Sequence, residues 1–195
     1  MKYDAKLILT TQLEILIPHY NDVGGLVTMT MEADRETELT LPPSRLVDLN
    51  LRLAGSSLQG ARDSAALILG TRSKVPVMIS RKHGMSLMPI TWPDYSERGW
   101  VNKLQVQYYL PKQTGLTTVH MKSGNVYEVP CSYNVFDNSM SKARRLHSEL
   151  TGRDQQIFRE PAILTQALHV QKGKSTTYAA TDKPSHVAER KMEWT

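Results

Sequence analysis

Two glycines enclose a pair of serines in the run GSSLQG at residues 55–60, and a basic residue, Arg62, follows. The loop that cradles nucleotide phosphates has the same glycine spacing. It also needs a lysine and then a serine or threonine directly after the second glycine, where this chain has Ala61. A serine nucleophile needs the spacing Gly-x-Ser-x-Gly, which the run lacks. What remains is a serine-capped helix start that could bind a phosphate of a nucleic-acid backbone.

Other catalytic and metal-binding patterns are missing from the sequence. No two of the six histidines stand three to five residues apart, and Cys131 is the single cysteine, so a zinc site is not expected. The carboxylates do not cluster in the apolar segments, so no general acid–base pair stands out. The sequence therefore predicts neither a metal nor a cofactor, and no enzymatic activity, although an unfamiliar enzyme stays open as an alternative.

Basic residues are concentrated in the middle of the chain. Residues 71–112 hold seven lysines and arginines but two acidic residues, whereas residues 1–70 carry a net charge of −3. A segment poor in acids is where contact with a polyanion is expected. Each basic residue could instead be a solvated surface charge, and the serines could be a helix cap and nothing more. The candidates for DNA contact are Ser56, Ser57, Arg62, Arg72, Lys74, Arg81, Lys82, Arg98, Lys103, Lys142 and Arg145.

Alternating apolar and polar residues predict strands with one buried and one wet face. Short apolar runs add further strand candidates. The segments concerned are 13–17, 27–31, 39–41, 75–79, 85–88, 104–110, 119–121 and 126–129. Corners that contain Gly and Asn join several of them, which is typical of antiparallel hairpins.

Three stretches have the apolar spacing of helices. Ser44 is expected to cap a helix over 45–53, and the Ser56-Ser57 pair is expected to cap a second helix over 58–69. The apolar residues of 136–150 fall on one stripe, which predicts a third helix packed against the core.

Together these elements predict an α+β fold, mainly an antiparallel sheet with two to three helices and a flexible C-terminal tail. Residues 1–160 are expected to form the domain, and the polar residues 161–195 to form a tail that is helical at most at its start and otherwise disordered. No stretch approaches the roughly 20 apolar residues of a membrane span. With no signal-peptide pattern and one cysteine, we expect a cytoplasmic protein without a membrane partner.

Four stretches, taken in their order, resemble the ComK family of competence transcription factors. They are GSS at 55–57 with Gly60 and a basic residue beyond, KVPVMI at 74–79, the strand entry GWV at 99–101, and SGNVYEVPCSYNVFDNS at 123–139. The resemblance covers residues 25–152. In the family pattern the basic residue follows the second glycine directly, whereas here Ala61 intervenes.

The resemblance implies a sequence-specific, DNA-binding activator of competence (DNA-uptake) genes. Such a protein reads A/T-rich boxes in double-stranded DNA through the minor groove and the backbone, and it acts as a homo-oligomer, a dimer or tetramer. The resemblance also implies removal by proteolysis through an adaptor protein and a Clp ATPase. The alternative is a protein-interaction or regulatory module of the same fold that uses its sheet edge or tail and binds no DNA.

Overall fold

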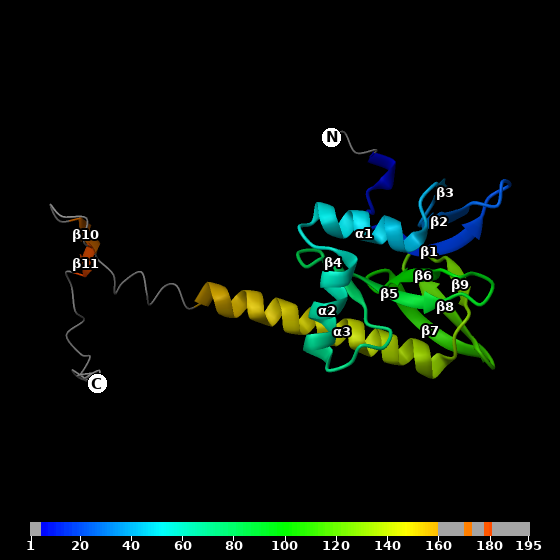
Figure 1. The fold of residues 1–195 in the computed structure, drawn as a ribbon. Coiled ribbons are helices and arrows are strands. Elements are labelled where there is room, and N and C mark those ends of the chain that lie inside the picture. Colours follow the sequence, from blue (N-terminus) through cyan, green and yellow to red (C-terminus); the bar gives the residue numbers. More distant parts are fainter. Residues whose placement is uncertain (1–4, 160–169, 173–177, 181–195) are drawn as a thin grey trace. The chain divides into compact units, whose positions relative to one another are not determined.

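The computed structural model describes residues 5–159, 170–172 and 178–180 (Figure 1). The chain divides into two compact units, Met1–Leu150 and Thr151–Thr195. The elements are η1 (Ala5–Leu7), β1 (Leu13–Tyr20), β2 (Leu26–Glu32), β3 (Glu36–Leu39), α1 (Pro43–Leu53), α2 (Leu58–Leu69), β4 (Val77–Ser80), β5 (Met85–Thr91), β6 (Arg98–Asn102), β7 (Val106–Gln113), β8 (Leu116–Met121), β9 (Val126–Val129), α3 (Tyr133–Arg159), β10 (Val170–Lys172) and β11 (Tyr178–Ala180).

A six-stranded antiparallel sheet forms the centre of the first unit, in the order β3-β2-β1-β6-β5-β4. Its two halves meet where β1 pairs with β6, at Ile15 opposite Val101 and Leu16 opposite Trp100. Neighbouring residues of a strand face opposite sides of the sheet. Ile15 and Val101 therefore enter one core, and Leu16 and Trp100 enter another on the opposite face.

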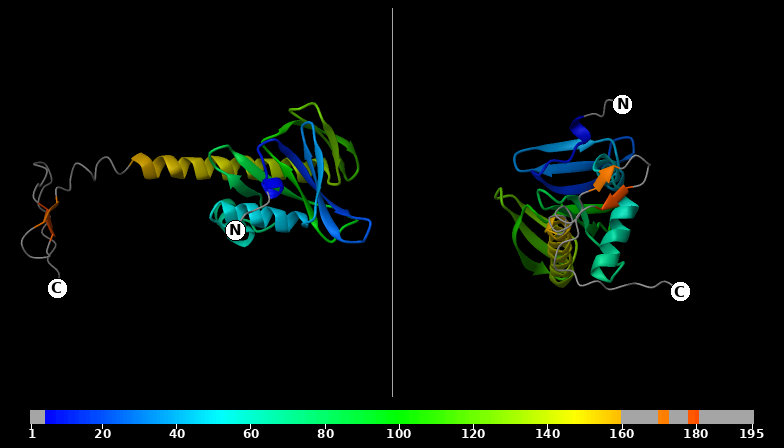
Figure 2. Two further views of the ribbon diagram at one scale, coloured as in Figure 1. Left: turned by 90° about the horizontal axis from the view of Figure 1, so that it is seen from above. Right: turned by 90° about the vertical axis from the view of Figure 1, so that its left-hand side faces the viewer.

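One face of this sheet is covered by α1 and α2, whose apolar residues Leu46, Val47, Leu51 and Leu58 pack around Trp100. The other face is covered by the three-stranded sheet β7-β8-β9 and the first half of α3. A third cluster joins α2 to α3 through Ala65, Ile68, Leu69, Leu146 and Leu150. In Figure 2 α3 accordingly lies between β7–β9 and α2. The predicted α+β fold, mainly antiparallel with three helices, is confirmed.

The helix caps are partly as predicted. The Ser57 side chain accepts a hydrogen bond from the Gly60 amide at 3.0 Å, and Gly70 ends α2 with φ of 68°. The prediction for Ser44 is wrong. Pro42 occupies the cap position of α1, because a proline at the first helical position, Pro43, starts the helix without needing its missing amide. The Ser44 hydroxyl instead donates to Glu97 at 2.6 Å.

The predicted strand segments 13–17 and 85–88 continue through the prolines that follow them. Pro18 lies within β1 and Pro89 within β5. β6 pairs with β1 only at residues 15 and 16, and β4 pairs with β5 only at residues 85–87. Each proline therefore has a paired strand on one side only, and its missing amide can face the unpaired side.

The alternation of apolar and polar residues does not mark β6, whereas the family resemblance marks residues 99–101 as the entry to a strand. Its residues Gly99, Trp100, Val101 and Asn102 are all buried, so no alternation of apolar and polar residues marks the strand. At Gly99 the backbone of β6 lies close to Trp92 and to β1. A Cβ atom there would lie 2.7 Å from Trp92 Cε3 and 2.8 Å from the Leu16 carbonyl oxygen.

Most of the predicted tail, residues 161–195, lies outside the described residues. Its described parts are the antiparallel pair β10 and β11. Among the described helices, none has a stretch long and apolar enough to cross a membrane.

Candidate nucleic-acid interface

Arg62 is held over the core of the molecule by an aromatic ring. It lies half-buried on α2, with its guanidinium carbon 5.7 Å from the centroid of the Trp100 ring on β6. This distance is typical of a cation–π contact. Burial, followed by the nearby charge of Arg98, lowers the pKa of Arg62, and Glu97 acts in the opposite direction. The Arg62 charge is thus partly desolvated and faces a second arginine.

Four of the candidate residues converge on one recess, which we call the Arg62 recess. Its volume is about 240 Å³, and it is lined by Gln59, Arg62, Asp63, Ala66, Arg72, Lys74, Val75 and Arg98. The four cations come from α2, from the loop that follows it and from β6. The one carboxylate, on Asp63, accepts a hydrogen bond from Gln59 at 3.0 Å. Four cations around one acid make this recess suited to a phosphate group.

The loop after α2 is tied to α3 by one hydrogen bond. Gly70 starts it in the left-handed conformation, and Lys74 has a φ of 47°, which is uncommon for a residue with a side chain. Lys142 of α3 donates a hydrogen bond to the Ser73 carbonyl at 2.8 Å. Lys142, a predicted contact, therefore supports the loop that carries Arg72 and Lys74.

The start of α2 is occupied by groups of the protein itself. Ser57 binds the Gly60 amide, and the Leu58 amide donates to the Asp48 carboxylate at 2.8 Å. This amide hydrogen bond is the main reason why the pKa of Asp48 lies below its usual value. Neither Ser56 nor Ser57 lines the Arg62 recess, so a phosphate contact by these serines, which stays a prediction, would be separate from that recess.

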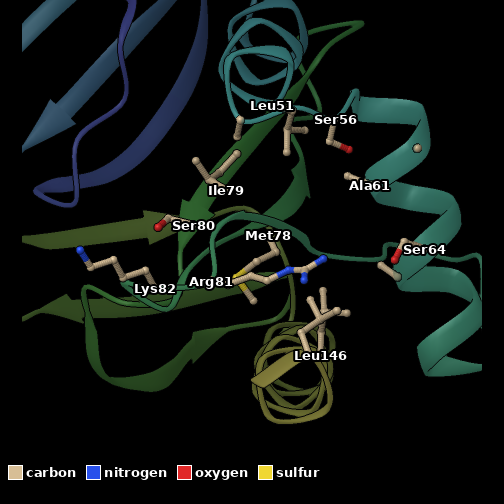
Figure 3. A pocket seen from close by; sticks show the side chains of 14 residues that line it. Leu51, Ser56, Ala61, Ser64, Met78, Ile79, Ser80, Arg81, Lys82 and Leu146 are labelled. Atoms are coloured by element: carbon tan, nitrogen blue, oxygen red, sulfur yellow. The ribbon is translucent and has the colours of Figure 1, made fainter. Parts of the chain in front are cut away.

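Ser56 lines a different recess, together with Arg81 and Lys82 (Figure 3). Its volume is about 390 Å³, and its walls come from α1, α2, β4 and α3. In Figure 3 the Arg81 side chain extends across the recess toward α2, whereas Lys82 extends away from α2. Apolar side chains, among them Met78 and Leu146, line much of it.

Lys103 lies apart from both recesses, directly after β6. Burial, and then the charges of Arg144 and Lys122, lower the pKa of Lys103. Lys122 lies in a neighbouring turn, and its amide donates a hydrogen bond to the Gln105 carbonyl at 2.9 Å. Sequence reasoning named Lys103 but missed Lys122 and Arg144. Their signal was weak, since Lys122 sits in a hairpin corner and Arg144 at the border of an apolar stripe. Arg145 is exposed on α3.

The described part of the chain contains no group of three histidines, cysteines or acids placed to hold a metal ion.

The comparisons with known proteins agree with the resemblance drawn from the motifs. The family described as ComK protein matches residues 5–155. A competence transcription factor of Bacillus subtilis (strain 168) is 24% identical over 130 residues, which cover 67% of this chain and 68% of that protein. No solved structure matches the chain. The family match spans the whole sheet and every candidate residue, so the chain belongs to the ComK protein family.

Proposed function

We propose that this protein is a transcription factor that regulates competence genes by binding double-stranded DNA. Membership of the ComK family supports this proposal, as does the name of the relative, a competence transcription factor. The observation that carries it in the structure is the Arg62 recess, where four cations from three segments meet around one carboxylate. We propose no enzymatic activity.

Within the recess, Arg62 is the best candidate to enter the minor groove. The Trp100 ring restricts its guanidinium, so less side-chain entropy is lost when DNA binds. A narrow A/T-rich minor groove concentrates negative potential and favours an inserted arginine. Arg72, Lys74 and Arg98 would then bind backbone phosphates on either side, which positions the protein without reading sequence.

The remaining partners follow the family resemblance. Two or four copies would bind paired A/T-rich boxes in the cytoplasm and activate transcription of DNA-uptake genes. An adaptor protein and a Clp ATPase would remove the activator when competence ends.

Fluorescence anisotropy on two labelled duplexes of equal length tests the proposal. One duplex carries two A/T boxes one helical turn apart, and the other is G/C-rich. We expect binding to the A/T duplex to be tighter by about 10³-fold or more. The logarithm of the affinity should fall with the logarithm of salt concentration by about 0.9 per phosphate contacted. Equal and weak binding to both duplexes would contradict DNA recognition.

The second candidate function is a protein-interaction module that binds no DNA. The observation that favours it is the recess of Figure 3, where apolar side chains such as Met78 and Leu146 stand beside the cations Arg81 and Lys82. A partner bound there mainly through apolar contacts would show little dependence on salt, unlike a duplex bound through phosphates.

A further inference from the structure

A second group of cations lies on the other flank of α3. We call it the Lys103 cluster, and it consists of Lys103, Lys122 and Arg144. Two hydrogen bonds fix its backbone, from the Lys103 amide to the Ser86 carbonyl at 3.0 Å and from the Lys122 amide to the Gln105 carbonyl at 2.9 Å. None of the three side chains forms an ion pair with any residue that the structure describes.

The cluster is separate from the Arg62 recess. On α3, Lys142 reaches the loop of that recess at Ser73, whereas Arg144 acts on Lys103. Two residues along a helix correspond to a rotation of about 200°, so Lys142 and Arg144 lie on opposite flanks of α3. Positive charge therefore borders the helix on both sides.

We propose that the Lys103 cluster is a second phosphate-binding site, so that one protein molecule contacts the DNA backbone on both flanks of α3. This inference rests on the proposed function, because it assigns the same duplex two points of contact. The chemistry that fits is a backbone phosphate: the three side chains are all donors without acceptor groups, two of them flexible ammonium groups and one a planar guanidinium.

In the free protein, the surroundings of Lys103 disfavour its positive charge. Burial, and then the charges of Arg144 and Lys122, lower the pKa of Lys103. Its ammonium is thus less stable in the folded than in the unfolded chain. The unfavourable free energy of the charged Lys103 is fully present below the lowered pKa and disappears above the ordinary value of 10.5. It is therefore present at neutral pH. An anion bound between the three cations would offset it.

Replacing Lys103 with methionine separates a binding role from a structural one. In free protein, Lys103→Met should raise the Tm by about 2 °C or more, because a desolvated charge is lost and the apolar stem is kept. In DNA binding, the same variant should lose about one unit of salt slope and about tenfold in affinity near 50 mM salt. Arg144→Gln should weaken binding in the same direction. The matched control is Lys112→Met, which removes an exposed lysine that pairs with Glu128.

The outcomes are distinct. Higher Tm with weaker DNA binding supports the second site. If Lys103→Met lowers the Tm and binds DNA like Lys112→Met, Lys103 has a structural role and the inference is wrong. In that case Arg62→Ala still reports on the proposed function, since it should weaken binding on its own. If the unaltered protein binds no duplex at all, the proposed function and this inference fail together.

Discussion

At the scale of single residues, the candidate interface depends on how charges are held rather than on how many there are. Arg62 and Arg72 belong to the same recess, but only Arg62 lies over an aromatic ring. Arg72 is exposed on a loop and free to follow a phosphate. If the proposed function holds, we expect Arg62 to give the sequence preference and its neighbours to give general affinity.

Replacing Arg62 tests this division. Arg62→Ala should weaken binding to the A/T duplex by about tenfold or more and reduce the preference over G/C, since the narrow A/T minor groove has the stronger negative potential for an inserted arginine. Arg62→Lys should keep the salt slope but lose the preference, because an ammonium lacks the planar shape. Anisotropy titrations on both duplexes measure the two effects. The control is Arg35→Ala, which breaks the ion pair with Glu32. Equal losses on both duplexes would contradict a base-reading role for Arg62.

At the scale of elements, one buried carboxylate joins the two sheets. Glu14 of β1 is 1% exposed and accepts hydrogen bonds from Ser123, Asn125 and Tyr127, which lie in and beside the turn before β9. All three donors belong to the run SGNVYEV that carried the family resemblance. That run thus has a structural task, because an unsatisfied buried carboxylate would be costly.

Alkaline pH should loosen this junction. Burial, and then the hydrogen bond to Glu14, raise the pKa of Tyr127, and burial raises that of Tyr109 to about 12. A raised tyrosine pKa contributes stability that is complete below pH 10 and is lost as the pH rises further. Urea denaturation from pH 7 to 11 should show this decline in the unaltered protein. Tyr127→Phe should lower the free energy of unfolding by about 1–2 kcal/mol at pH 7. Above pH 10, the free energy of unfolding of this variant should decline less than that of the unaltered protein. Curves that stay parallel up to pH 11 would contradict the assignment.

Gly99 should be the glycine of the central sheet least tolerant of a methyl group. The added Cβ would meet the Trp92 ring and the Leu16 carbonyl of β1, so Gly99→Ala should destabilise the fold by about 1–3 kcal/mol. Gly152→Ala is the matched control: apart from its chain neighbours and the nearby backbone of its own helix, no atom lies within 4 Å of its added Cβ, and alanine favours a helix by about 1 kcal/mol over glycine. Urea midpoints of the two variants should shift in opposite directions. A shared direction would mean that β6 can move away from β1.

The elements with regular periodicity were predicted well from the sequence, and those without it were not. The strands up to Met31 and the three helices follow their apolar spacing, and Ser57 and Gly70 bound α2 as expected. β6 shows no alternation of apolar and polar residues because both its faces are buried. The predicted range of β5 ends before Pro89, whereas the strand continues to Thr91. The basic residues could be named, but not grouped. Their sorting into the Arg62 recess and the Lys103 cluster depends on contacts between segments far apart in the chain.

At the scale of the whole molecule, charge is unevenly distributed along the chain. The acidic residues of the first third include Glu36 and Glu38 on the edge strand β3, whereas both cation groups come from residues 62–144. A polyanion is therefore expected to approach the second part of the domain. The proposed boundary at residue 160 keeps both cation groups together.

A chain ending at residue 160 should retain DNA binding. The cations of both groups precede residue 145, and the first compact unit ends at Leu150. Circular dichroism should show a cooperative thermal transition like that of the full chain, and anisotropy should give an unchanged affinity for the A/T duplex. If the shortened chain folds but binds weakly, residues 161–195 belong to the interface and the boundary is wrong.

The pairing of β1 with β6 has a consequence for synthesis on the ribosome. β1 is made early, but its partner on one side ends at Asn102, so the middle of the sheet stays open while the intervening residues are added. At about 5–20 residues per second, this interval lasts on the order of 4–17 seconds. During it, β1 is paired with β2 on one side only, and its other edge, at Ile15 and Leu16, stays open to chaperones and proteases. We therefore expect the yield of folded protein to depend partly on how fast the residues between β1 and β6 are translated.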